Sequence, residues 1–391
     1  MRPAFLLTPV SAVLFSVSLH AQPGALNTSF GVDGKVLIAA GSTDEGDNPR
    51  AVVVQPDGRI VVVGYVFPMS QLSWGYVARL MPNGALDASF GSGGIVSWIP
   101  STGTLQINAV AMQPDGKILL GGAKGTAAVT TTQDAWFGRL NTDGTIDAGF
   151  GVGGERVLAL STSTDYVIGV GVAADGAIYG HIHSGPPSNA PACMARLTPE
   201  GQTDASFNGN GVRCNLYGGN SGNSIGGIAV RTDGAALGAG SVSSGKVAAV
   251  LANGQFDSGF GTSGLATSPA GTNAWRTSGI GIRPDGRILV TTWKPTSPFS
   301  IQLAQLMPNG SPDPSFGTDG LALFTPQGMN ISTWMSNAVI YPDGRIIISW
   351  GRFNSAASEL DHAVSWFNAD GSPHSIGTVI TDMGPNSSDQ D

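Results

Sequence analysis

Two stretches between Ala51 and Trp98 decide the fold: AVVVQPDGRIVVVG at residues 51–64 and YVARLMPNGALDASFGSGGIVSW at residues 76–98. The runs 51–54 and 60–63 are apolar and rich in β-branched residues, which favours strands. Between them, Pro56 presets φ, Asp57 can bond the following backbone and Gly58 tolerates positive φ, so the pair predicts a β-hairpin. Because both runs are continuously apolar, we expect both faces of these strands to be covered.

Two further strands follow this hairpin. Residues 77–80 alternate more in polarity and end in a Pro-Asn-Gly turn at 82–84, which is typical of an edge strand. A cassette, LDASFG at 86–91, then leads into a fourth apolar run at 95–98. The unit is therefore predicted to contain four short antiparallel strands.

The unit repeats along the whole chain. The Asp-Gly of the first turn recurs six times, with gaps of 58, 60, 58, 52 and 58 residues, at Asp57, Asp115, Asp175, Asp233, Asp285 and Asp343. Six four-stranded units without polar capping repeats predict an all-β fold, a β-propeller of about six four-stranded antiparallel blades. One strand is surplus: either 35–40 or 378–382 can complete a blade begun at the other end of the chain.

The cassette carries two recurrent residues. Its aromatic residue is predicted to be a wedge that fills the seam between neighbouring blades, and it stands at Phe30, Phe90, Phe150, Phe207, Phe260 and Phe316. Its Asp is predicted to cap a turn, with metal binding as the alternative, and it stands at Asp87, Asp147, Asp204, Asp257 and Asp313. A degenerate seventh cassette is present at 374–377.

The three motifs together resemble the delta-60-repeat (domain of unknown function) β-propeller family of bacteria. They are Q-P-D-G-[RK]-[IV], [VA]-x-R-L-x-[PT]-[DN]-G and L-D-x-S-F-G-x-x-G, and the resemblance covers about residues 24–380. It implies a propeller and no settled activity. The strand-end Arg is kept at Arg79, Arg139 and Arg196 but replaced by Val250, Gln305 and Trp366, which argues against a catalytic role.

The ends of the chain predict its localisation. Residues 1–21 have a basic Arg2, a largely apolar run at 4–19 and a small residue at Ala21, as a signal peptide does. We therefore expect an exported, periplasmic or extracellular, protein with a single domain at 22–383 and a polar tail at 384–391. No later run is apolar enough to span a membrane, and a monomer is expected. A formal net charge of -8 argues against nucleic-acid binding.

Comparison of the units locates the candidate binding face. The Pro-Asp-Gly turn and the cassette are constant, whereas the connections at the opposite end of each unit vary, and such loops on a rigid scaffold commonly carry function. Aromatic side chains on these loops could stack on a glycan or anchor a protein partner, with local packing as the alternative: Trp74, Tyr217, Trp275 and Trp334. The prediction is a binding or scaffolding module for an unknown protein or glycan.

Residues that could carry chemistry are few. His181 and His183 have a spacing that metals can use, but no third ligand is near in sequence, so a structural or solvent-facing pair is favoured. Export permits a disulfide between Cys193 and Cys214. We place Cys193 at the start of an edge strand and Cys214 in the next unit's first strand, and the distance expected between outer and inner strands of adjacent blades argues against the bond. We predict no catalytic, cofactor-binding or metal-binding residue. The alternative is a hydrolase or lyase with a metal-assisted site in the central channel.

Overall fold

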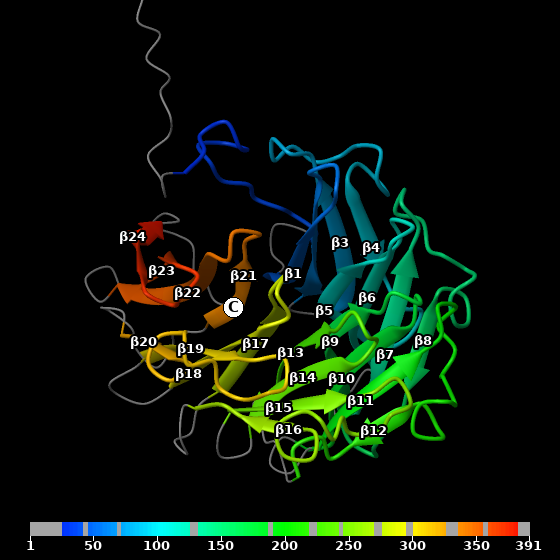
Figure 1. The fold of residues 1–391 in the computed structure, drawn as a ribbon. Coiled ribbons are helices and arrows are strands. Elements are labelled where there is room, and N and C mark those ends of the chain that lie inside the picture. The colour runs from blue at the N-terminus through cyan, green and yellow to red at the C-terminus, as the bar shows by residue number, and fades with distance from the viewer. Residues whose placement is uncertain are drawn as a thin grey trace, which may run out of the picture.

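The computed structural model describes residues 26–41, 46–68, 72–125, 132–186, 191–218, 225–241, 245–269, 276–294, 300–325, 335–354 and 359–381. These residues form six four-stranded antiparallel sheets arranged in a ring and no helix (Figure 1). The predicted β-propeller of six blades is confirmed. Among the described residues there is accordingly no helix that could span a membrane. The leader at 1–21 and the tail at 384–391 lie outside the described residues.

Each blade is a consecutive up-and-down sheet whose first strand is innermost (Figure 1). The first three blades consist of β1 (Gly46–Val54), β2 (Ile60–Phe67), β3 (Trp74–Leu80) and β4 (Ile95–Trp98); β5 (Thr104–Met112), β6 (Ile118–Gly125), β7 (Gln133–Leu140) and β8 (Glu155–Leu158); and β9 (Asp165–Val172), β10 (Ile178–Ser184), β11 (Ala192–Leu197) and β12 (Val212–Cys214).

The last three blades have the same order. They consist of β13 (Ile225–Val230), β14 (Ala236–Ser241), β15 (Gly245–Val250) and β16 (Leu265–Thr267); β17 (Arg276–Ile282), β18 (Ile288–Lys294), β19 (Ser300–Leu306) and β20 (Leu321–Phe324); and β21 (Met335–Ile340), β22 (Ile346–Asn354), β23 (Glu359–Phe367) and β24 (Pro373–Thr381).

The Pro-Asp-Gly turns form the hairpins that the sequence predicts. Asp57 accepts a hydrogen bond from the backbone N–H of Arg59 at 3.0 Å, and Gly58 has φ +84°, a conformation that glycine adopts without steric cost. The register then places Val54 opposite Ile60 and Val52 opposite Val62. The hairpin therefore fixes which side chains face the preceding blade and which face the following one.

Five of the six predicted cassette aromatics are wedges between blades, whereas Phe30, before the first blade, is only half-buried. Phe90, Phe150, Phe207, Phe260 and Phe316 are all fully buried. The ring of Phe90 lies against Gly144 in the third-strand turn of the next blade, where a Cβ would be 3.0 Å from two ring atoms. A backbone hydrogen bond of 2.9 Å from Gly91 to Asp143 closes the same seam. Each of the five rings belongs to a buried apolar cluster that joins two consecutive blades.

The first and last described segments of the chain belong to the first and last blades. β24 takes the outer position of the last blade, so the C-terminal segment completes that sheet. Residues 35–40 form no strand; instead Ile38 and Ala40 pack on Tyr76 and Ala78 of the first blade. Of the two segments that could supply the surplus strand, the C-terminal one does so, and the ring is not closed by the N-terminal one.

Candidate functional site

The predicted loop aromatics do not form one exposed cluster in the described structure. Trp275 and Trp334 lie outside the described residues. Trp74 begins β3 and is half-buried, and its indole Nε1 is buried without a hydrogen-bond partner within the described ranges. Phe67, at the end of β2, is 53% exposed at the same end of the first blade, although the sequence reasoning did not single it out. Within the described residues, the predicted aromatics therefore do not form a stacking surface at this end.

The prediction that Tyr217 is an exposed ligand-binding residue is corrected by its burial. The side chain is 1% exposed, and its hydroxyl donates a 3.0 Å hydrogen bond to Nε2 of His181. Nδ1 of His181 in turn donates to the carbonyl of Gly226 at 3.0 Å. The loop after β12 folds inward because the ring fills the seam between the third and fourth blades. Tyr217 therefore stabilises the fold and is not available to a ligand.

The two histidines are structural, which was the favoured prediction. His181 is fully buried, and desolvation lowers its pKa to about 4 although two backbone carbonyls oppose the shift. His183 is also buried and stacks on Tyr166 with ring centroids 4.6 Å apart. Among the described residues, no three or more His, Cys, Asp and Glu side chains are grouped so that they could hold a metal ion.

The recurrent cassette Asp caps its turn and also holds a cation. Asp87 accepts hydrogen bonds from the Ser89 backbone and hydroxyl at 3.0 and 2.6 Å and from Nε of Arg79 at 2.8 Å. The Arg79 guanidinium lies over Phe90, 4.4 Å from the ring centroid, and reaches the Thr142 carbonyl of the next blade. The hydrogen bond from the Ser89 hydroxyl and the contact with Arg79 lower the pKa of Asp87, despite some burial.

The structure explains why the strand-end Arg can be exchanged within one molecule. Where Val250 replaces it, Arg231 from the first turn of the blade reaches Asp257 at 2.8 Å. Where Gln305 replaces it, Arg287 reaches Asp313 at 2.9 Å. The guanidinium is thus supplied from another position of the same blade, and the ion pair is a structural contact that joins blade, turn and wedge.

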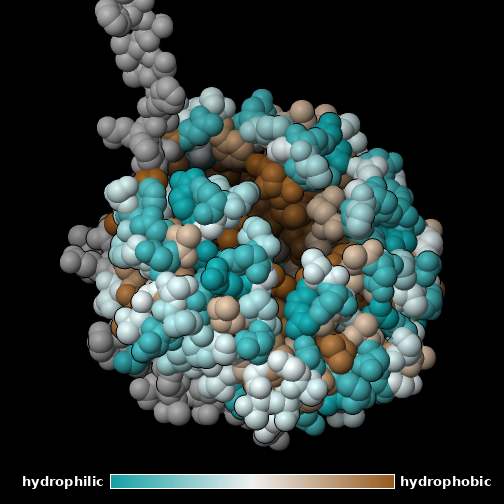
Figure 2. All heavy atoms as spheres, viewed as in Figure 1, coloured by the Kyte–Doolittle hydropathy of each residue, from teal (hydrophilic) through white to brown (hydrophobic). Residues whose placement is uncertain are grey.

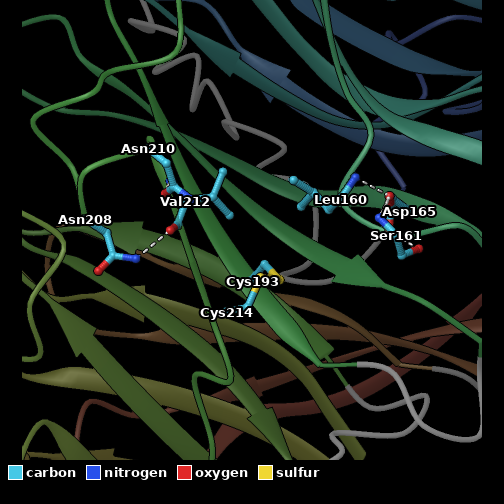
Figure 3. Close-up of a disulfide and its surroundings, with 8 residues drawn as sticks. All are labelled: Leu160, Ser161, Asp165, Cys193, Asn208, Asn210, Val212 and Cys214. Carbon is cyan, nitrogen blue, oxygen red and sulfur yellow. Dashed lines mark hydrogen bonds between the residues drawn. A yellow bond between two sulfur atoms is a disulfide. The ribbon is translucent and has the colours of Figure 1, made fainter.

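Cys193 and Cys214 form a disulfide (Figure 3). The two residues are directly opposite on β11 and β12 of one blade, with Cα atoms 3.9 Å apart. The assignment of Cys214 to the first strand of the next unit was wrong, and with it the expected separation. A short fourth strand, β12, ends at this residue, and Cys214 itself is exposed.

A cavity of about 530 Å³ adjoins the disulfide between the second and third blades. Figure 3 shows its polar groups bonded locally: Asn208 Nδ2 donates to the Val212 carbonyl at 2.8 Å, and Asp165 accepts from the Leu160 backbone at 2.7 Å. The remaining wall is mainly aliphatic. The bonded polar groups and the aliphatic wall give this cavity, as far as the structure describes it, little that would select a ligand.

The seam between the last and first blades differs from the packed seams. In the packed seams, Gly171 lies against Val230 of the next blade and Gly281 against Ile340, with an added Cβ at 2.7 and 2.8 Å from those side chains. The strand registers place Val339 and Val54 at the equivalent positions of the remaining seam. These two side chains are 59% and 62% exposed.

Side chains of both blades that border this seam are exposed or only partly buried. Val52 is 62% exposed, whereas its equivalent in the third blade, Val170, is 9% exposed. Opposite it, Ile347 and Val364 of the last blade are only partly buried. No buried apolar cluster of the described residues joins these two blades, whereas one joins each of the other neighbouring pairs.

At the unpacked contact between the last and first blades, Figure 2 shows a hollow with apolar walls near the centre of the ring, beside the first blade. Valine and isoleucine side chains offer no hydrogen bonds, so such a surface favours apolar partners and lacks the groups needed for acid–base or nucleophilic catalysis. Exposed aliphatic faces on two inner strands are the most distinctive surface feature of the described structure. We call this feature, formed by Val52, Val54, Val339, Ile347 and Val364, the open seam.

The family comparison adds independent support for the repeat. Residues 55–90, 113–150 and 283–316 match the model of the domain of unknown function (DUF5122) beta-propeller. The segments lie in the first, second and fifth blades, and each ends at the wedge Phe. The match supports a bacterial β-propeller family of unknown function, whereas the narrower delta-60-repeat name stays a prediction. No curated protein is significantly similar to the chain in sequence.

Several solved structures are similar in fold. A protein of unknown function from Bacteroides caccae has 11% identity and a TM-score of 0.47, over 83% of this chain and 95% of that one. A protein of unknown function from Dyadobacter fermentans has 10% identity and a TM-score of 0.46, over 79% and 94%. A calcium-binding protein, regucalcin, from Agrobacterium tumefaciens has 11% identity and a TM-score of 0.38, over 77% and 81%. By sequence, the chain is similar in three of its six blades to a β-propeller domain of unknown function.

Proposed function

We propose that the protein is an exported, non-catalytic binding module that holds an apolar segment of a protein partner in the open seam. The observation that carries this proposal is the exposure of Val52, Val54 and Val339 at positions whose equivalents are packed between blades elsewhere. An exposed apolar surface of this kind between two sheets favours association.

The open seam favours a polypeptide over a glycan. Sugars are held by aromatic faces and by polar groups that bond their hydroxyls, and the side chains of the seam are aliphatic. An apolar polypeptide side chain can occupy the space that a neighbouring blade occupies in the packed seams. The residues of the open seam lie next to the constant first turns of the first and last blades, so the proposal moves the binding surface away from the variable-loop end.

Export is supported by the disulfide. Such bonds persist in oxidising compartments and are rare in the cytosol. The Cys193–Cys214 bond therefore agrees with the signal peptide predicted at residues 1–21. The second candidate, a metal-assisted hydrolase or lyase in the central channel, has no observation in its favour, because no suitable group of ligands occurs among the described residues.

The test uses a charge placed in the seam. Val52→Asp should leave the fold intact because the side chain is already 62% exposed, and Val152→Asp, at a residue 77% exposed in a cassette, is the matched control. Both variants and the unaltered protein are immobilised and exposed to envelope extract and culture medium. A captured protein is identified, purified and titrated against all three.

The expected result is a partner whose affinity falls by roughly tenfold or more for Val52→Asp and is unchanged for Val152→Asp, because burying a carboxylate against an apolar side chain is costly. Equal affinity for all three proteins would place the binding surface elsewhere. Failure to capture any partner, together with no binding of an apolar fluorescent dye by the unaltered protein, would contradict an accessible apolar seam.

A further inference from the structure

A second cavity lies between the fifth and sixth blades, at the end of the propeller that carries the constant turns. Its volume is about 420 Å³, which is within the range of small-molecule sites. Its walls are the first turn of the fifth blade (283–287), the first turn of the sixth blade (342–344) and the third-strand turn of the sixth blade (369–370), with Gln305 and Ser315 at the base. The sixth blade separates this cavity from the open seam.

The fifth blade carries an arginine that makes no ion pair within the described residues, Arg283. In the fourth blade, Arg231 binds both Asp233 and Asp257. Arg283 stands at the equivalent position of the fifth blade, but there Arg287 takes both equivalent carboxylates, with 2.7 Å to Asp285 and 2.9 Å to Asp313. Arg283 therefore makes no ion pair within the described residues, whereas its equivalent in the fourth blade, Arg231, makes two.

The Arg283 side chain is buried and makes no ion pair within the described residues, although the charges of Asp285 and Asp313 partly offset its desolvation. It is 6% exposed, and neither Nε nor Nη2 has a hydrogen-bond partner in the part of the chain that the structure describes. Its guanidinium lies 5.7 Å from the centroid of the Phe316 ring, and Nη1 lies beside Gly344, so contacts on both sides fix its orientation. Burial lowers the pKa of Arg283, which agrees with a cation removed from water.

The two nitrogens of Arg283 that have no hydrogen-bond partner among the described residues indicate which ligand group the cavity would bind. Nε and Nη2 form one edge of the guanidinium, and this edge binds both oxygens of a carboxylate in parallel. Gln305 lines the same cavity and donates its amide to Asp313 at 2.6 Å, whereas its Oε1 is buried and accepts no hydrogen bond from the described residues. A matching ligand would therefore present a planar anion to Arg283 and a neighbouring hydrogen-bond donor to Oε1 of Gln305.

The charges at the rim restrict the anion further. Asp285 and Asp343 line the opening and are each paired with an arginine of their own turn, Arg287 and Arg345, at 2.7 Å. Asp370, also at the rim, accepts from the Ser372 backbone and hydroxyl. Three carboxylates around one free cation disfavour a dianion such as phosphate and tolerate a monoanion.

We propose that this cavity is a binding site for a small hydroxycarboxylate, with sugar acids as the ligand class. The carboxylate binds the Nε–Nη2 edge of Arg283, and a hydroxyl donates to Oε1 of Gln305. The residues that carry this assignment belong to the turns of two blades, so an occupied site also links the fifth blade to the sixth.

The test measures binding of D-glucuronate by calorimetry and by ligand-observed NMR. D-glucose supplies hydroxyls without a carboxylate, propionate supplies a carboxylate without hydroxyls, and inorganic phosphate supplies the competing anion. Arg283→Met keeps the apolar stem and removes the cation, and Arg283→Lys keeps the charge but loses the two-donor edge. Arg50→Gln, at an exposed residue of the first blade, controls for the loss of one positive charge.

The expected result is a glucuronate Kd of about 1 mM or below, weakened roughly tenfold or more in both Arg283 variants and unchanged in Arg50→Gln. Glucose is expected not to bind, and propionate and phosphate are expected to bind more weakly than glucuronate. Without ligand, Arg283→Met is expected to melt at the same or a higher temperature, because it removes an unpaired buried charge.

Three results would overturn the proposal. One is no glucuronate binding by the unaltered protein, and another is equal binding by the Arg283 variants. Tighter binding of phosphate than of glucuronate would assign the cavity to a different anion. A marked fall in the melting temperature of ligand-free Arg283→Met would show that the guanidinium is already compensated within the fold.

Discussion

The two cassette rings Phe90 and Phe30 occupy the same place in the repeat but different environments. Phe90 is fully buried between the first two blades, under the Arg79 guanidinium and against Gly144. Phe30 precedes the first blade and is only half-buried, although its cassette docks in the same way, with a 2.8 Å bond from Gly31 to the Asn83 carbonyl. Replacing each ring by alanine therefore compares the stability contributed by a closed seam with that contributed by the open seam.

The expected costs follow from burial. Phe90→Ala removes a fully buried ring and leaves a cavity, which should lower the free energy of unfolding by about 3–5 kcal/mol, including the contact with Arg79. Phe30→Ala removes a ring that is half in water and should cost about 1 kcal/mol. The larger loss of stability is therefore expected for Phe90→Ala, at the seam where the first and second blades pack together.

Urea unfolding monitored by tryptophan fluorescence measures both values. Equal slopes with denaturant show that the variants unfold over the same surface as the unaltered protein, so their midpoints can be compared. A cost for Phe30→Ala as large as that for Phe90→Ala would mean that the last blade closes on the N-terminal cassette in solution. A cost below about 1 kcal/mol for Phe90→Ala would refute the wedge.

Three further predictions concern the groups that hold individual blades together. Burial lowers the pKa of His181 from 6.5 to about 4, so the neutral form contributes stability that is complete above pH 6.5 and is lost as the pH falls. The free energy of unfolding should fall by about 3 kcal/mol between pH 7 and pH 4. His181→Gln should remove this pH dependence, which acid unfolding curves would measure. Replacing Cys193 and Cys214 by Ser opens a loop with a sequence separation of 21 and should lower the free energy of unfolding by about 2–4 kcal/mol, and reduction of the unaltered protein without loss of stability would contradict this. Arg139→Met leaves Asp147 with only Lys117, at 2.9 Å, and should cost about 3–5 kcal/mol by thermal unfolding; an additional Asp147→Asn substitution should recover part of the loss, and no recovery would contradict the pairing.

Most of the fold could be predicted from the sequence because its information is local and repeated. Each Pro-Asp-Gly turn sets a hairpin, and each Phe marks a seam, so six copies determine six blades. The position of Cys214 was misjudged because β12 has only three residues, too few for an apolar pattern to separate it from the next unit. The exchange of Arg79 for Arg231 or Arg287 could have been found by following the basic residues around each Asp through the copies.

The open seam could not be predicted because it depends on a competition between distant segments. Residues 35–40 and β24 both suit the outer edge of β23, and their sequences do not reveal which one pairs there. The burial of Tyr217 likewise depends on His181, which lies 36 residues earlier on another strand. The surplus of Arg283 appears only when the ion pairs of the fourth and fifth blades are compared in three dimensions.

The most direct test of the open seam is the reactivity of a thiol placed in it. Val52→Cys and Val170→Cys stand at equivalent positions of the first and third blades, where the side chains are 62% and 9% exposed. With the native disulfide intact, Val52→Cys should react with a maleimide at a rate close to that of a free thiol, and Val170→Cys should react roughly tenfold or more slowly, because only local opening exposes it. Equal protection of the two thiols in the purified protein would contradict an open seam, and with it the proposed binding surface.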